Sequence, residues 1–194
     1  AGIPTTFNGV VGFRPTSGSI PHDVVRDARI RMPMSGPLGR TVADVALLLG
    51  AMTDVAVSAV PAPGKPRVAY SPDLGDLPLD PEVRAATQRA ADLLADAGWD
   101  IVEACPDLSG ADLCFEDLRG LFMALTSADL ADDERVKATA RYEISLGLTL
   151  GADRITAAVE AEDRLRANWD RFFSAGRFDL FISATSQVPP FPVG

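Results

Sequence analysis

The sequence of 194 residues carries a formal net charge of −9 at neutral pH, and 47 % of its residues are hydrophobic. This length suffices for one domain with its own core or for most of a larger one, and no apolar stretch is long enough to cross a membrane. The acidic charge argues against nucleic acid as the main partner, because phosphate binding requires a basic surface.

Residues 1–39 are rich in glycine and proline, and we expect them to form loops with short apolar runs. A helix is predicted within residues 36–52. Thr41 can cap its N-terminus, and Asp44 follows at the spacing of a capping box. Arg40 and Asp44 also have the i,i+4 spacing of a local ion pair. The residues predicted on the buried face of this helix are Val42, Val45, Ala46 and Leu49.

A strand–helix–strand unit is the clearest local pattern in the sequence. Residues 67–71 and 99–104 are predicted strands, and Pro72 ends the first of them. The helix between them has Asp80 as a cap and Gly98 at its C-terminal end. Short connections of this kind are typical of an α/β crossover. The stripe predicted to be buried consists of Val83, Ala86, Ala90, Leu93 and Ala97.

The second half of the sequence is predicted to be mainly helical. Residues 108–150 have weak caps and scattered glycines, whereas residues 152–176 form a strongly amphipathic pattern. The stripe predicted along one face of this last helix consists of Ile155, Ala158, Val159, Glu162, Leu165, Trp169 and Phe172, with Glu162 as its one polar member at the edge. A strand at 178–184 and a proline-rich segment follow.

Three polar residues, Thr185, Ser186 and Gln187, come directly after this last strand. Ligands of open α/β sheets gather beyond the carboxyl ends of the strands, so these side chains could line a binding crevice. A polar exit from the strand without any ligand is the alternative. The sequence contains no dinucleotide-binding glycine motif, phosphate-binding loop or calcium loop, and we expect no cofactor.

The cysteines and the histidine limit the chemistry further. Cys105 and Cys114 lack the spacing of a metal or redox motif, and we interpret them as reduced thiols of a cytoplasmic protein. His22 is the single histidine of the sequence, which argues against a histidine-based triad or a histidine-rich zinc site within it.

Two segments of the sequence resemble known motifs of the amidase signature family. The segment at residues 3–21 resembles the stretch that follows the serine nucleophile in these enzymes. Its matching positions are Pro4, Gly9, Gly12, Arg14, Pro15, Thr16 and Gly18. The segment at residues 35–49 resembles a second motif, matched by Gly36, Pro37, Arg40 and Asp44. Weaker sequence similarity to bacterial amidases extends over nearly the whole chain.

The resemblance implies an α/β fold with a mixed sheet covered by helices on both faces. Residues 1–194 would be part of a single amidase domain, from just after the nucleophile motif to before the last strands. The implied reaction is hydrolysis of a small-molecule amide through a Ser–cis-Ser–Lys triad. In such a triad a neutral lysine acts as general base through the bridging serine.

The motif places the implied nucleophile just before Ala1 and the rest of the triad further upstream. We therefore expect no catalytic residue within these 194 residues, and we expect the piece alone to be inactive. The residues to which we assign no catalytic role are Ser17, Ser19, Lys65 and Lys137. The candidate substrate-binding residues are Ile3, Thr185 and Gln187.

Two alternatives stay open beside a simple amidase. Gly2 stands where the family has an arginine, which favours a degenerate member that binds without catalysing. The other alternative is the glutamine-amidase subunit of a tRNA-dependent amidotransferase. Whether Ala1-Gly2 is bonded directly to Ile3 also stays open. The oligomeric state stays open as well, and a homodimer is one alternative. Neither nucleic acid nor a membrane is an expected partner.

Overall fold

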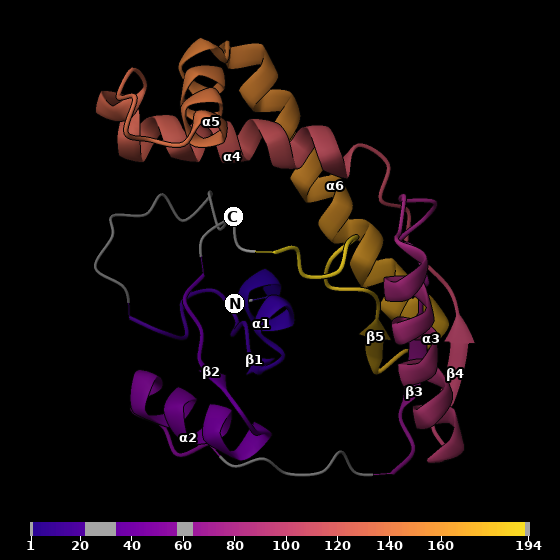
Figure 1. The fold of residues 1–194 in the computed structure, drawn as a ribbon. Coiled ribbons are helices and arrows are strands. Elements are labelled where there is room, and N and C mark those ends of the chain that lie inside the picture. The colour runs from indigo at the N-terminus through magenta and orange to yellow at the C-terminus, as the bar shows by residue number, and fades with distance from the viewer. Residues whose placement is uncertain (1, 22–33, 58–63, 193–194) are drawn as a thin grey trace. The chain divides into compact units, whose positions relative to one another are not determined.

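The computed structural model of the chain, shown in Figure 1, describes residues 2–21, 34–57 and 64–192. The contacts among these residues divide the chain into two compact units. Unit 1 contains the described residues up to Cys105 and from Phe173 onward, and unit 2 contains residues 106–172. His22 lies outside the described residues. The single amidase domain over residues 1–194 stays a prediction.

The expectation of loops is wrong at the start of the chain, where Gly2–Asn8 form a short helix, α1. The Thr5 hydroxyl donates to the Gly2 carbonyl oxygen at 2.6 Å. The Asn8 side chain donates to the Pro4 carbonyl oxygen at 2.8 Å. These local bonds hold the turn, and Pro4 lies in the first turn, where a missing N–H leaves no helical bond unmade.

A small antiparallel ladder follows α1. Strand β1 (Val11–Gly12) pairs with strand β2 (Leu38–Gly39). The Phe13 N–H extends the ladder by donating to the Pro37 carbonyl oxygen at 3.1 Å. The ladder therefore joins the two segments that carry the sequence motifs.

Helix α2 (Val42–Thr53) begins with the predicted capping box. The Asp44 N–H donates to the Thr41 hydroxyl at 3.1 Å, and the Thr41 N–H donates to the Asp44 carboxylate at 3.0 Å. The predicted ion pair is wrong, because Arg40 is exposed and the Asp44 carboxylate serves the cap instead. The residues predicted on the buried face differ: Val45 and Ala46 are buried, Leu49 is half-buried and Val42 is exposed.

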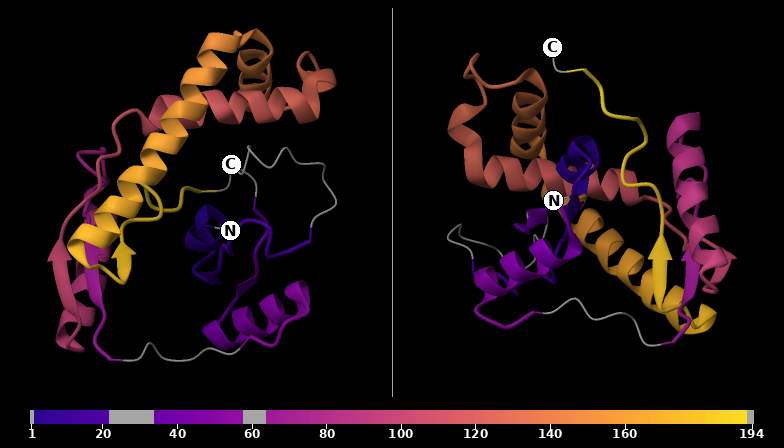
Figure 2. Two further views of the ribbon diagram at one scale, coloured as in Figure 1. Left: turned by 180° about the vertical axis from the view of Figure 1, so that it is seen from behind. Right: turned by 60° about the horizontal axis from the view of Figure 1, so that its bottom comes forward.

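Three parallel strands form the main sheet of unit 1, in the order β4-β3-β5. Strand β3 (Arg67–Tyr70) is central, and it pairs with β4 (Asp100–Glu103) and β5 (Leu180–Ile182). Helix α3 (Pro81–Asp96) connects β3 to β4 and runs alongside the strands in both Figure 1 and Figure 2. The predicted crossover is thus confirmed, and parallel and antiparallel pairs both occur among the described residues.

Both ends of α3 are as predicted, but its buried stripe is not. The Asp80 carboxylate accepts the Glu82 N–H at 2.8 Å, and Gly98 follows the helix with a φ of +87°. Ala91 is buried, whereas Leu93 is 69 % exposed. Alanines lie on every side of this helix, so the apolar pattern does not specify which side packs. The other exposed members of the predicted stripe are Ala86, Ala90 and Ala97.

Unit 2 is helical, as predicted. Its elements are α4 (Ala111–Ser127), the short 3₁₀ helix η1 (Ala128–Leu130), α5 (Ala138–Thr149) and most of α6 (Ala152–Gly176). The weak caps are confirmed, since neither Gly110 before α4 nor Lys137 before α5 provides a side-chain cap. Packing rather than capping therefore holds these helices in place.

The interior of unit 2 combines small apolar side chains with one ion pair. Cys114 and Leu118 of α4 pack against Ala158 and Ala161 of α6. The Asp117 carboxylate, whose side chain is 9 % exposed, pairs with the Arg154 guanidinium at 2.6 Å. All members of the predicted α6 stripe are buried or half-buried, and Ala161 extends it.

Within the described ranges, no helix combines the length and the apolar composition that crossing a membrane requires. Cys105 and Cys114 are both free thiols; the first is half-buried and the second is buried. Burial raises the pKa of the Cys114 thiol, which keeps it protonated and unreactive.

Candidate functional site

Strands β3 and β5 end side by side at the carboxyl edge of the sheet. The Ser71 N–H, just past β3, donates to the Ile182 carbonyl oxygen of β5 at 2.9 Å. Residues 71–80, called the 71–80 loop below, lead from β3 to α3. Residues 183–188, the β5 exit, follow the other strand. The two segments therefore leave the sheet together, at the edge where open α/β sheets bind ligands.

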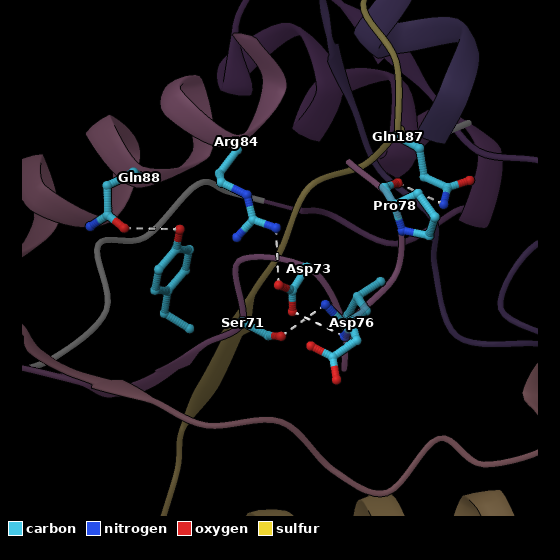
Figure 3. A network of polar contacts seen from close by, with 9 residues as sticks. Ser71, Asp73, Asp76, Pro78, Arg84, Gln88 and Gln187 are labelled. Atoms are coloured by element: carbon cyan, nitrogen blue, oxygen red, sulfur yellow. Dashed lines mark hydrogen bonds and ion pairs between the residues drawn. The ribbon is translucent and has the colours of Figure 1, made fainter. Parts of the chain in front are cut away.

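The 71–80 loop is held by its own polar groups and by α3 (Figure 3). The buried Ser71 hydroxyl accepts the Leu74 N–H at 2.9 Å. The Asp73 carboxylate accepts the Asp76 N–H at 3.3 Å and a guanidinium N–H of Arg84 at 3.0 Å. The hydrogen bond from Arg84 lowers the pKa of Asp73 below its usual value. Asp73 is thus an ionised anchor of the loop at neutral pH.

Gln187 joins the β5 exit to this loop. Its side-chain amide donates to the Pro78 carbonyl oxygen at 3.0 Å (Figure 3). Its backbone carbonyl accepts the Asp80 N–H at 2.9 Å. The Ser186 hydroxyl is also occupied, because it donates to the Val188 carbonyl oxygen at 2.9 Å. Of the predicted substrate-binding residues, Gln187 is therefore the one whose side chain is bound to the loop.

A second series of hydrogen bonds connects β3 to α3. The buried Tyr70 hydroxyl donates to the Gln88 amide oxygen at 3.2 Å, and the Gln88 amide donates to Asp92 at 2.9 Å. Burial, and next the nearby Glu103 carboxylate, raise the pKa of Tyr70. Tyr70 is therefore a neutral structural donor that ties β3 to α3.

The start of α1 reaches the β5 exit. A Cβ added to Gly2 would lie 3.5 Å from the Thr185 methyl group, in ordinary contact. The rings of Phe7 and Phe191 make an edge-to-face contact with their centroids 5.0 Å apart. Ile3 is 58 % exposed. The exposed Thr185 hydroxyl has no hydrogen-bond partner within the described part of the chain. The structure thus places Thr185 beside the residue that precedes Ile3.

Two cavities lie on either side of the β5 exit. The larger, of about 380 Å³, lies between the exit and α3, and Val83, Ala86, Pro189 and Pro190 are among its apolar walls. The smaller, of about 170 Å³, lies between the exit and the 71–80 loop. Thr185 and Ser186 line both cavities.

The motif residues pack closely against one another in α1, β1 and β2. A Cβ on Gly12 would overlap the side chain of the buried Thr5, and a Cβ on Gly36 would overlap the Phe13 carbonyl oxygen. Only glycine allows these backbone approaches. The other matching positions are Pro4 in α1, Gly9 and Gly18 in turns, Arg14, Pro15 and Thr16 after β1, Pro37 before β2, and Arg40 and Asp44 at the start of α2.

The family model for amidases matches residues 2–194. The chain belongs to the amidase family. The family membership and the fold class inferred from the motif residues are thereby confirmed.

Other amidases are similar to this chain in sequence and in fold. The chain is 29 % identical over 212 residues to an acylamidase of Rhodococcus erythropolis, covering 98 % of this chain and 44 % of that protein. It is 36 % identical over 125 residues to an indoleacetamide hydrolase of Bradyrhizobium japonicum, covering 55 % of this chain and 27 % of that protein. A crystal structure of an amidase superposes with a TM-score of 0.84 at 23 % identity, covering all of this chain and 44 % of the other. The chain therefore spans less than half the length of these amidases.

Serine hydroxyls also lie at this edge of the sheet. The hydroxyls of Ser71, Ser183 and Ser186 are bonded to backbone groups, and among the residues that the structure describes none of them is paired with a basic side chain. The 71–80 loop and Arg84 were not among the sequence candidates. The rule that directed attention to the end of β5 applies equally to the end of β3, and it would have indicated the loop.

Proposed function

We propose that the protein containing this chain hydrolyses a carboxylic amide to a carboxylate and ammonia or an amine. The observation that carries the proposal is the match of the amidase family model to residues 2–194. The cavities at the β5 exit are consistent with it, since they give an amide a place beside Thr185.

The proposed reaction follows the Ser–cis-Ser–Lys triad that the motifs imply, supplied by residues other than those of this sequence. The nucleophilic serine oxygen attacks the amide carbonyl carbon while its proton passes through the bridging serine to a neutral lysine. The C–N bond then breaks, and the amine leaves with a proton. Water next cleaves the acyl-serine ester and regenerates the enzyme. Backbone N–H groups beside the nucleophile would stabilise the oxyanion.

In this scheme the chain supplies support and binding. The contact of Gly12 with Thr5 holds α1 against β1, and the start of α1 lies next to Thr185. The β5 exit and the 71–80 loop then form the walls against which a substrate lies. None of these residues needs to exchange a proton during the reaction.

The experiment uses the native gene product, purified and incubated with acetamide, benzamide and acetanilide. Release of ammonia or aniline, together with covalent labelling by a fluorophosphonate, is the expected result. Enzyme treated beforehand with the fluorophosphonate is the control and should release nothing. An enzyme preparation that neither hydrolyses any amide nor reacts with the fluorophosphonate would overturn the proposal.

We further propose that the protein acts in the cytoplasm. The two free thiols, Cys105 and Cys114, support this, because reduced cysteines persist in reducing compartments. Cell fractionation that recovers the protein outside the cytoplasmic fraction would contradict it.

A further inference from the structure

The smaller cavity at the sheet edge, called the loop pocket below, is an apolar site with few polar groups. Its volume is about 170 Å³, and its walls include Pro72, Leu74, Leu77 and Leu79 of the 71–80 loop and Thr185 of the β5 exit. An apolar cavity of roughly 150 Å³ is large enough to bind benzene. The loop pocket therefore has room for one phenyl ring.

The backbone that forms the pocket is held in an unusual conformation. Leu74, Gly75 and Asp76 have φ values of +55°, +84° and +74°. Such values are uncommon for residues with a side chain, and they persist only where surrounding contacts enforce them. The hydrogen bonds of Ser71 and Asp73 within the loop, and that of Gln187 to Pro78, provide this enforcement. The pocket is thus formed before any ligand arrives.

The polar groups of the pocket favour a neutral ligand. Asp73 is the ionisable side chain of its lining, and Arg84 already holds that carboxylate at 3.0 Å. The Gln187 and Ser186 side chains are bonded to backbone oxygens. The Thr185 hydroxyl has no partner within the described residues, and a hydroxyl can both donate and accept. A charged group would find no counter-ion here, whereas an amide beside Thr185 would find a hydrogen bond.

We propose that the loop pocket binds a neutral apolar substituent of the amide substrate, of the size of one phenyl ring. Thr185 lines both the loop pocket and the larger cavity, so its hydroxyl is the group that bonds the amide. Leu77 is then a residue that determines specificity. This inference rests on the proposed amide hydrolysis, and it adds to it the class of substrate: an amide with an aromatic or short branched aliphatic group.

The first test detects ligand in the pocket directly, from spectra recorded before the amide is consumed. The native protein with labelled leucine methyl groups is titrated with benzamide and with acetanilide, which carry the ring on the acyl and on the amine side. We expect shifts of the Leu74 and Leu77 methyl signals with at least one of the two compounds, and no shift of Leu93, which lies on α3 outside the pocket. Unchanged Leu74 and Leu77 signals with both compounds would overturn the proposal.

The second test changes the size of the pocket. Leu77 is 45 % exposed, so its truncation should not prevent folding. Leu77→Ala should raise kcat/KM for a naphthalene carboxamide relative to benzamide by about tenfold or more, because a single methylene group in a hydrophobic pocket is already worth about tenfold. Leu77→Phe should lower kcat/KM for benzamide relative to that for acetamide. Leu93→Ala is the matched control and should alter neither ratio.

The two tests separate the inference from the function on which it rests. Amide hydrolysis with the same size preference in wild type and both Leu77 variants would overturn the loop pocket and leave the proposed function standing. Leucine methyl shifts in a protein that hydrolyses none of the amides would overturn the proposed function and still support the pocket as a site for a neutral ring.

Discussion

Gly120 of α4 and Gly147 of α5 meet backbone to backbone. A Cβ added to Gly147 would overlap the carbonyl oxygen of Gly120 and would lie 2.8 Å from the Ala124 Cβ. The two helices of unit 2 can approach this closely only because neither residue has a side chain at the crossing.

Gly147→Ala should therefore destabilise the protein by about 1–3 kcal/mol, the usual effect of forcing extra atoms into a packed interior. Ser145→Ala is a suitable control, because Ser145 is exposed on the same helix and its change should stay within about 0.5 kcal/mol. Denaturant unfolding measures both. Equal midpoints for the two variants would show that the crossing does not depend on Gly147.

The ion pair between Asp117 and Arg154 predicts an asymmetry between its two partners. The Asp117 side chain is 9 % exposed, whereas that of Arg154 is 49 % exposed. Asp117→Asn leaves an arginine that water can solvate, and should cost about 1 kcal/mol. Arg154→Met leaves a buried carboxylate without its partner and should cost more. Unfolding midpoints at neutral pH compare them, and a smaller loss for Arg154→Met would contradict the argument.

Acid should loosen the 71–80 loop through Asp73. The hydrogen bond from Arg84 lowers the pKa of Asp73 from its ordinary value of 3.8. The stabilisation from this carboxylate is therefore fully present above pH 3.8, and it is lost as the pH falls through the lowered pKa. Arg84→Gln should bring the pKa of Asp73 back toward 3.8. Titration of the carboxyl carbon of Asp73 by NMR checks this, and an unchanged Asp73 midpoint in the variant would contradict it.

The contact of Gly12 with Thr5 should be essential for the packing of α1 against β1. Gly12→Ala places a Cβ against the Thr5 side chain and should cost about 1–3 kcal/mol. Thr5→Ser keeps the hydroxyl that bonds to the Gly2 carbonyl oxygen and removes the methyl group that the new Cβ meets. The double variant should therefore recover part of the loss in thermal unfolding. Strictly additive losses would show that the two residues do not interact.

Local signals in the sequence predicted local structure well. The cap at Asp80 and the glycine at Gly98 are short-range signals, and α3 lies between them. The apolar spacing of α6 also predicted its buried side. The stripe of α3 was wrong because Ala90 and Ala91 are equally apolar, so only packing decides between them.

The start of the chain and the binding edge show what a sequence pattern cannot indicate. Helix α1 depends on a hydrogen bond from Thr5 to Gly2 in a stretch whose glycine and proline content is typical of loops. The bond from Gln187 to Pro78 joins residues 109 positions apart, and no local spacing reports such a pair. The end of β5 was a reasonable place to expect a site. The 71–80 loop opposite it could be recognised only from the pairing of β3 with β5 in the structure.

The pairing of β3 with both β4 and β5 has a consequence for how the protein assembles. Arg67 and Asp100, 33 positions apart, are joined through a short crossover, whereas the bond from Arg67 to Asp179 closes 112 positions. Contacts of long sequence separation form slowly, because the intervening chain must first be brought into place. The β5 exit, which forms the second wall of the loop pocket, therefore reaches its place only after residues 106–172 have been brought into position. We expect refolding to recover helical signal before benzamide binding, so that binding competence reports the end of folding; stopped-flow traces in which the two signals rise together would contradict this order.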